Sequence, residues 1–184
     1  MFRILLIFLI LNFYSPVFSS AKEKIISQMK LTNNLSFNFN QTIDDKNENG
    51  KCIIKYPKKI SCEYYNTNKK IIVSNGKSLV IKNRNSGSYY IYPLNRTPLE
   101  FLLDKEYLIS KMKIFEPKEI DGKYLNFKIF EKNNEINIFF DKRNLNLVGW
   151  QTEDIYQNLT ITFISSVRIN QEIDNKIFIL PKNN

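Results

Sequence analysis

The sequence predicts a mainly β protein in which about eleven antiparallel strands form a large, strongly curved sheet or open barrel. Short runs of alternating apolar and polar residues recur along the chain, and turn sequences separate them. The connections are short, as is typical of antiparallel neighbours, and only two segments have helical periodicity. We expect strands at residues 35–43, 51–56, 60–66, 70–74, 78–83, 88–92, 112–119, 123–131, 135–140, 146–153 and 157–165.

The segments between these runs are rich in Asn, Asp, Gly and Pro, which favour turns. Asn75-Gly76 and Asp121-Gly122 are dipeptides typical of tight hairpins. The other predicted turns are DDKNENG, YPKK, NTNK, NRNSG, KNNE and DKRN.

The first residues have the layout of a secretory signal peptide. Arg3 precedes an unbroken apolar run, and small residues close the segment. Because the run is much shorter than the ~20 residues that span a bilayer, an uncleaved anchor is the less favoured alternative. We expect residues 1–21 to be the signal peptide, with cleavage after Ser19 or Ala21, and residues 22–184 to form one exported domain.

The first of two predicted helices covers residues 22–34, KEKIISQMKLTNN. Ile25, Ile26, Met29 and Leu31 fall along one face of it, which makes the helix amphipathic.

The second predicted helix covers residues 97–110. Thr97 suits the N-cap, Pro98 suits the first helical position, and Glu100 completes a capping box with Thr97. Its first two turns are too short to be stable alone in water, so they must lie on something apolar. The apolar stripe consists of Leu99, Leu102 and Leu103.

Cys52 and Cys62 come opposite each other if the chain turns around Tyr56, Pro57 and Lys58. Two facing thiols in an exported protein favour a disulfide, and free buried thiols are the alternative. Such a bridge would fix the register of the hairpin and do no chemistry.

The alternation of apolar and polar residues also predicts that one face of the sheet is apolar, for instance at Leu125, Phe127 and Ile129. Two short helices are a small cover for so large a face, which predicts a concave apolar surface and hence a cavity. The alternative is a packed core, because 14 Phe and 10 Tyr residues are enough to fill the space.

The formal net charge of +9 falls to +8 when the segment with Arg3 is removed. A basic balance of this size can attract an anionic membrane or nucleic acid, which is the alternative. Because the basic residues are scattered along the chain without a cluster or motif, we expect a solvated surface and no nucleic-acid partner.

Catalysis is disfavoured because the chain has no histidine, which removes Ser-His and Cys-His pairs and imidazole metal sites. The carboxylates of Glu119 and Asp121 are close in sequence, but Asp121 belongs to a turn dipeptide. Five glycines leave little room for a phosphate-binding loop. We expect no enzyme activity, no cofactor and no metal.

Five motifs in the right order resemble the LolA family of periplasmic outer-membrane lipoprotein carriers, over nearly the whole mature chain. They are KYPKKISCEY at 55–64 (family RPGKxRWEY), IIVSNGKSLVIKN at 71–83 (IVSDGKxLWxYD), YPLNRTPLEFLL at 92–103 (PLxxTPLxxLL), INIFFDKRNLNLVGWQTEDIYQNLTITF at 136–163 (LxFDxxLxLxGWxxxDxxGxxTxxxL) and VRINQEIDNKIF at 167–178 (VxxNxxLxxxxF).

The resemblance implies an incomplete barrel of eleven antiparallel strands, with short helices as a lid over an apolar cavity for lipoprotein acyl chains. It implies a periplasmic carrier, acting as a monomer, that escorts acylated lipoproteins from the inner to the outer membrane. Its implied partners are an inner-membrane lipoprotein-releasing ABC transporter and an outer-membrane acceptor that the sequence does not identify.

The motifs depart from the family pattern in the first hairpin and at the end of the chain. The family Arg before Pro57, which is associated with tying the lid to the barrel, is Tyr56 here, and the second family Arg and the aromatic after it are Ser61 and Cys62. The chain ends at LPKNN, without the extra strand or tail of some members. We therefore expect lid gating and cargo hand-over to differ.

The predicted cavity residues lie on the first hairpin, after the Asn-Gly turn, on the lid and on two later strands. The tyrosines among them could place hydroxyls at the mouth. The set is Ile54, Tyr56, Cys62, Tyr64, Leu79, Ile81, Leu99, Leu102, Leu103, Phe127, Ile129, Ile138 and Phe140. Two alternatives remain, a related periplasmic carrier of free lipid or glycolipid, and a non-carrier envelope interaction protein of the same fold.

Overall fold

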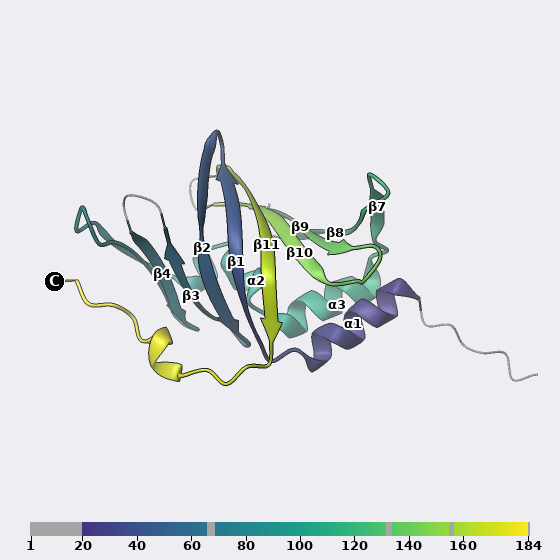
Figure 1. The fold of residues 1–184 in the computed structure, drawn as a ribbon, viewed down its shortest axis with the longest axis horizontal. Coiled ribbons are helices and arrows are strands. Elements are labelled where there is room, and N and C mark those ends of the chain that lie inside the picture. The colour runs from purple at the N-terminus through teal and green to yellow at the C-terminus, as the bar shows by residue number, and fades with distance from the viewer. Residues whose placement is uncertain (1–19, 66–68, 132–133, 155–156, 184) are drawn as a thin grey trace, which may run out of the picture.

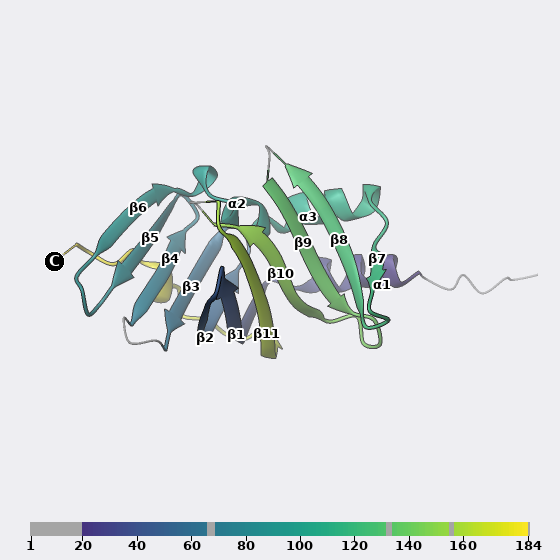
Figure 2. The ribbon, with the colours of Figure 1, turned by 90° about the horizontal axis from the view of Figure 1, so that it is seen from above.

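The eleven strands of the described residues form one antiparallel sheet, which curves into an open half barrel (Figures 1 and 2). The computed structural model describes residues 20–65, 69–131, 134–154 and 157–183. The strands follow the order β6-β5-β4-β3-β2-β1-β11-β10-β9-β8-β7. Their bounds are β1 Asn34–Ile43, β2 Lys46–Lys55, β3 Lys59–Tyr64, β4 Lys70–Asn75, β5 Ser78–Asn83, β6 Tyr89–Pro93, β7 Lys118–Ile120, β8 Tyr124–Glu131, β9 Asn134–Asp141, β10 Leu147–Glu153 and β11 Leu159–Ile169.

The helical elements are short. In the described residues, no helix has the length and apolarity needed to cross a membrane. The α-helices are α1 Ala21–Leu31, α2 Leu99–Leu102 and α3 Lys105–Ile114, and the 3₁₀ turns are η1 Leu94–Arg96 and η2 Asn175–Phe178. α1 and α3 lie side by side beneath strands β8 to β10 (Figure 1).

Asn and Asp side chains close the hairpin turns. Asn75 Oδ1 accepts the backbone N–H groups of Lys77 and Ser78 at 2.9 and 3.0 Å. Asp141 Oδ1 accepts those of Asn144 and Arg143, and these hydrogen bonds lower the pKa of Asp141. The turn chemistry expected from the sequence therefore forms at both ends of the sheet.

The long strands β1 and β11 occupy the middle of the sheet, although they come from opposite ends of the domain (Figure 1). β11 continues four residues beyond the predicted end at 165, and its pairing with β1 has an irregularity opposite residues 36–38. Ser166 has a φ of 52° at this point. The irregularity changes the side-chain alternation, so Val167 and Ile169 turn to the concave face.

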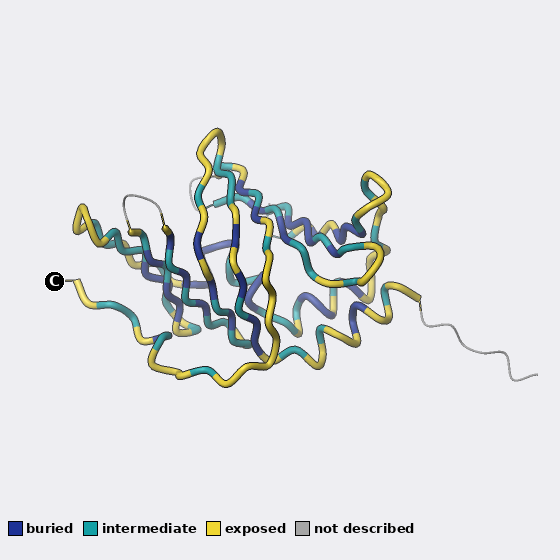
Figure 3. The backbone as a smooth tube through the Cα atoms, in the orientation of Figure 1, coloured by how far each residue is buried: buried dark blue, intermediate teal, exposed yellow. Residues whose placement is uncertain are grey.

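The core fills the concave side of the sheet, where the buried stretches of the strands gather (Figure 3). The convex side of β3 and β4 is covered by the chain after β11. Phe178 of η2 is 3% exposed there, against strands whose outward residues include Ile71 and Val73. This segment explains why β4 is buried on both faces.

Several predicted bounds were wrong. The strand predicted at 112–119 is only β7, because α3 continues to Ile114. The predicted loop at 44–50 is a tight turn, since β2 starts at Lys46 and pairs along its whole length with β1. Most of the predicted signal peptide, much of the NTNK turn and half of the KNNE turn lie outside the described residues.

Candidate functional site

The first of two chambers on the concave face, here the helix chamber, lies between the sheet and the helices. Its volume is about 300 Å³, at the lower end of the range for ligand pockets. Its wall is mainly aliphatic and aromatic, with Gln28, Thr32 and Asn146 as polar residues. The lining residues are Ile25, Gln28, Met29, Thr32, Leu35, Ile54, Tyr56, Ile60, Leu99, Leu102, Leu103, Leu108, Ile138, Phe140, Leu145, Asn146, Leu147, Trp150, Val167 and Ile169.

The second chamber, here the sheet chamber, has a volume of about 320 Å³ and lies over β1 to β6, β10 and β11. The lining from β2 to β5 is mainly apolar and includes the Cys52–Cys62 disulfide, although Tyr64 and Lys70 also lie there. The lining from β1, β10 and β11 includes threonine hydroxyls, the Gln41 amide and the Glu153 carboxylate. Its lining residues are Phe39, Gln41, Ile43, Cys52, Ile60, Cys62, Tyr64, Lys70, Ile72, Leu79, Ile81, Tyr90, Tyr92, Thr97, Pro98, Leu99, Trp150, Thr152, Glu153, Asp154, Thr160 and Thr162.

Three residues line both chambers and form the partition between them, Ile60, Leu99 and Trp150. Trp150 is held by an edge-to-face contact with Phe37, with ring centroids 5.8 Å apart. Leu99 lies on the short helix α2, which no side-chain cap holds at its N-terminus. A movement of α2 would displace Leu99 and so alter this partition.

The lid over the chambers is made of η1, α2 and α3, and its start differs from the prediction. The Thr97 hydroxyl donates to the carbonyl of Leu94 at 2.9 Å, so it does not cap the helix that follows. The predicted capping box of Thr97 and Glu100 was wrong, because Thr97 closes the preceding 3₁₀ turn. The single helix predicted over 97–110 is also divided, since Asp104 breaks it and caps α3 by accepting the N–H of Tyr107 at 3.1 Å.

Lys58, in the turn between β2 and β3, joins the sheet to this lid. Its Nζ lies 3.3 Å from Glu100 Oε1 and 3.4 Å from Asp104 Oδ2. Its backbone N–H donates to the carbonyl of Leu103 at 2.8 Å. A cation near the position of the missing family Arg thus contacts both pieces of the lid.

A second lysine holds the lid to α1. Lys105 Nζ donates to the carbonyls of Lys30 and Thr32 at 3.1 and 2.9 Å, at the C-terminal end of α1 where carbonyls lack helical partners. The Lys105 ammonium also lies 5.9 Å from the ring centroid of Tyr56 in the helix chamber. Burial raises the pKa of Tyr56 to about 12, so its hydroxyl is neutral at physiological pH.

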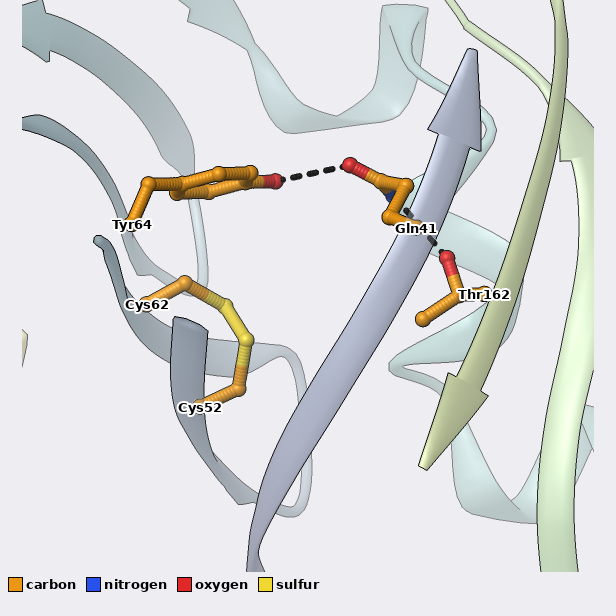
Figure 4. The surroundings of a disulfide bond; sticks show 5 residues. All are labelled: Gln41, Cys52, Cys62, Tyr64 and Thr162. Carbon is orange, nitrogen blue, oxygen red and sulfur yellow. Dashed lines mark hydrogen bonds between the residues drawn. A yellow bond between two sulfur atoms is a disulfide. The ribbon is translucent and has the colours of Figure 1, made fainter. Parts of the chain in front are cut away.

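A hydrogen-bonded relay crosses the floor of the sheet chamber (Figure 4). The Tyr64 hydroxyl donates to Gln41 Oε1 at 3.0 Å, and Gln41 Nε2 donates to Thr162 Oγ1 at 2.9 Å. The relay joins β3, β1 and β11, three strands that span the middle of the sheet. Burial, followed by the charge of Glu48, raises the pKa of Tyr64.

The Cys52–Cys62 disulfide lies beside this relay (Figure 4). The two residues are directly paired between β2 and β3, with Cα atoms 4.1 Å apart. The chain turns at residues 56–58, as predicted, and neither cysteine is free. The bridge fixes the apolar side of the sheet chamber.

Most predicted cavity residues line one chamber or the other. Phe127 and Ile129 are the exceptions, because both are fully buried beneath the lid and line neither chamber. Ile54, Tyr56, Leu102, Leu103, Ile138 and Phe140 line the helix chamber, Cys62, Tyr64, Leu79 and Ile81 line the sheet chamber, and Leu99 lines both.

The sequence did not reveal the residues that separate the two chambers or the residues that place polar groups in the sheet chamber. Trp150 and Thr152 alternate along a predicted strand, which was the available signal. Val167 and Ile169 carried no such signal, because their orientation depends on the irregularity at Ser166. Leu31, predicted on the apolar face of the first helix, is 71% exposed because it lies at the helix end.

The carboxylates considered for catalysis serve structural contacts. Glu119 Oε2 lies 2.7 Å from Lys142 Nζ, and Asp121 has a φ of 51° in the turn that follows β7. Among the described residues, no group of three or more acidic, Cys or His side chains could hold a metal ion.

The family model of the outer membrane lipoprotein carrier protein LolA matches residues 30–180. The chain belongs to the LolA family. None of the curated proteins compared with the chain matches it.

Several solved structures are similar to this chain at low sequence identity. An uncharacterized conserved protein from Thermus thermophilus has a TM-score of 0.52 at 7% identity, over 89% of this chain and 96% of that one. A LolA superfamily protein from Nitrosomonas europaea has a TM-score of 0.44 at 8% identity, over 88% and 99%. A DUF1329 family protein from Desulfovibrio piger has a TM-score of 0.45 at 9% identity, over 86% and 95%.

The structure and the family match confirm the predicted fold, a mainly β antiparallel sheet that is not closed into a barrel and carries short helices. The described residues form three α-helices where two were predicted. Membership of the family places the chain among LolA-like binding proteins of the periplasm and envelope. LolA-like proteins are binding and carrier proteins rather than enzymes.

Proposed function

We propose that this LolA-family protein carries the acyl chains of lipoproteins across the periplasm, from the inner to the outer membrane. The observation that supports the proposal is the pair of adjoining chambers beneath a lid of short helices. Its partners would be an ABC transporter that releases lipoproteins from the inner membrane and an acceptor at the outer membrane.

The energetics of acyl transfer require such a cavity. At about 0.8 kcal/mol per buried CH₂, a sixteen-carbon chain gains roughly 12 kcal/mol on leaving water. An acyl chain therefore does not cross an aqueous compartment without a carrier. A carrier that matched the membrane in apolarity would in turn fail to release its cargo.

The lid contacts fit this balance between binding and release. The ion pairs of Lys58 are partly exposed, and pairs of this kind contribute about 0.2–1 kcal/mol each. The helix α2 is a single turn, which has little stability of its own. A closed state held by such contacts is only slightly favoured over an open one, so a bound chain can shift the equilibrium.

Native mass spectrometry of the mature protein, purified from the periplasm of its host, tests this proposal. We expect a co-purified triacylated lipoprotein, which is lost in Leu102→Asp because a carboxylate enters the helix chamber. Leu31→Asp is the matched control, since Leu31 is 71% exposed and Leu102 is 7% exposed. Circular dichroism establishes that both variants fold.

Two outcomes would contradict the proposed cargo. Bound phospholipid or glycolipid alone would keep the cavity and assign it a free lipid. A protein without any bound mass, under conditions in which a known carrier keeps its cargo, would favour an envelope interaction protein with the same fold.

A further inference from the structure

Buried hydroxyls line one wall of the sheet chamber. Thr152 and Thr160 are directly paired between β10 and β11, and Thr162 is the next inward residue of β11. The three residues are 6%, 6% and 2% exposed. The lining from β2 to β5 consists of the disulfide, Leu79 and other apolar residues, together with Tyr64 and Lys70. This chamber therefore has a threonine-rich wall and a mainly apolar wall.

The threonine-rich wall retains hydrogen-bond donors for a ligand. Thr162 Oγ1 accepts from Gln41, and a hydroxyl that accepts one hydrogen bond still has its own proton to donate. Gln41 uses one amide proton in that bond and has a second. The Thr152 and Thr160 hydroxyls reach backbone carbonyls only at 3.3 and 3.4 Å, near the limit for a hydrogen bond.

The charges around this wall disfavour an anionic ligand. Lys70 is the one cation that lines the sheet chamber in the described part of the chain, and its ammonium forms an ion pair with Glu48. The Lys70 ammonium also lies 4.0 Å from the centroid of the Tyr64 ring. Glu153 and Asp154 line the same chamber, so a phosphate group would meet more negative than positive charge.

From this arrangement we infer that the sheet chamber binds the neutral, ester-linked glyceryl end of the cargo, with its carbonyl oxygens accepting hydrogen bonds from the threonine and glutamine side chains. The helix chamber, whose polar residues are few, takes the hydrocarbon. The inference rests on the proposed carrier function and adds a specificity for uncharged glycerides over phospholipids. The chambers adjoin at Ile60, Leu99 and Trp150, so the inference requires that a single ligand spans both when this partition moves aside.

Equilibrium binding of three matched probes to the full mature chain tests the inference. The probes are 1,2-dioctanoylglycerol, its diether analogue 1,2-dioctylglycerol, which lacks the carbonyls, and dioctanoyl phosphatidic acid, which adds a phosphate. We expect the diester to bind about tenfold more tightly than the diether, the equivalent of one or two hydrogen bonds. We expect the phosphatidic acid to bind at least about tenfold more weakly than the diester, because of the acidic groups.

Variants then locate the effect. In Thr162→Val the preference for the diester over the diether should fall to about twofold or less, because the hydroxyl is lost at nearly constant volume. Thr42→Val, on the same sheet but outside both chambers, should keep the full preference. Thr162→Ser, which restores a hydroxyl at the position tested, should recover most of the preference, and the comparison with Thr162→Val separates hydrogen bonding from packing.

Different binding results would overturn this inference and the proposed function. Equal binding of diester and diether to the wild type would overturn the inference and leave the carrier function intact, whereas no binding of any probe would overturn both. A further arm compares dioctanoylglycerol with the same glyceryl group attached to the cysteine of a short peptide. Tighter binding of the peptide supports a lipoprotein as the source of the ester, and equal binding supports the same site with a free glyceride.

Discussion

Lys58 Nζ lies 3.3 Å from Glu100 Oε1, so a single ion pair ties the turn between β2 and β3 to the lid helix α2. The second carboxylate, Asp104, is the N-cap of α3. One ammonium therefore bridges the two pieces into which the lid is divided. Replacing it should loosen the lid without disturbing the sheet.

Lys58→Met should lower the free energy of unfolding by about 0.5–1.5 kcal/mol, since two partly exposed ion pairs are lost. Hydrogen exchange of the amides at 99–104 should accelerate more than that of the strands, because the lid opens locally. Lys113→Met, on the exposed side of α3, is the matched control and should change neither. Uniform acceleration over the whole sheet would contradict a local role for Lys58.

The same ion pairs predict a dependence on alkaline pH. Burial lowers the pKa of Lys58, but its hydrogen bonds to and attraction by Glu100 and Asp104 outweigh burial and raise the pKa above 10.5. A raised lysine pKa stabilises the folded state fully below the unfolded value, and the stabilisation is lost as pH rises through the folded value. The stability difference between wild type and Lys58→Met should thus be constant from about pH 7 to about pH 10 and shrink above that. Urea titrations at several pH values measure this stability difference. A difference that increases as the pH is raised beyond about 10 would contradict the prediction.

The disulfide should stabilise the fold because it closes a loop and so restricts the unfolded chain. Cys52 and Cys62 are ten residues apart in sequence, and closing a loop of that length restricts the unfolded chain by about 2.5 kcal/mol. We expect the double variant Cys52→Ala/Cys62→Ala to lose about that much in chemical denaturation. The wild type in reductant should show a similar loss, and an unchanged midpoint in both would refute the prediction.

Gly50 allows β2 to approach β3 beside the sheet chamber. A Cβ at this position would lie 2.2 Å from the carbonyl oxygen of Glu63 and 2.8 Å from the ring of Phe39. Gly50→Ala should therefore cost at least about 2 kcal/mol of unfolding free energy. Gly87→Ala is the comparison, because nothing lies within 4 Å of its added Cβ and its φ of +72° alone should cost about 1 kcal/mol. Equal losses in thermal unfolding would show that the close approach is unimportant.

The start of α1 predicts the mature N-terminus. Ser20 and Glu23 form a capping box, in which each side chain bonds the other residue's backbone N–H. Cleavage after Ser19 would keep this box, whereas cleavage after Ala21 would remove its serine. We expect the intact mass of the exported protein to match a chain that begins at Ser20. We also expect Ser20→Ala to lower the free energy of unfolding by about 1 kcal/mol. A mature chain that begins at Lys22 would contradict this assignment.

The strands were predictable because their signals are local. Alternation and turn residues such as Asn75-Gly76 and Asp121-Gly122 are local features of the sequence. Ten of the predicted strands formed near the expected places, whereas the one predicted at 112–119 overlaps β7 only at residues 118–119. The lid was predicted less well because capping depends on which backbone groups are available. Thr97 has the right residue type for an N-cap, but its hydroxyl bonds the carbonyl of Leu94 instead.

The site was predictable only in its apolar part. Apolar alternation identified Leu79 and Ile138, since a buried sheet face requires such residues. The polar wall was missed because Thr152 and Thr162 are common strand residues, whose significance arises only when two strands place their hydroxyls in one chamber. The link between Lys58 and the lid was missed because it joins residues 42 positions apart.

The described strand order ends at β6 on one side and β7 on the other, and these two strands do not pair. A closed barrel must break a seam of backbone hydrogen bonds to widen, whereas this sheet can flatten by small changes in twist at many strand pairs. The width of the open sheet can therefore change without breaking backbone hydrogen bonds. If the protein is a carrier as proposed, bending of the whole sheet would let the same concave face accept cargoes of different bulk.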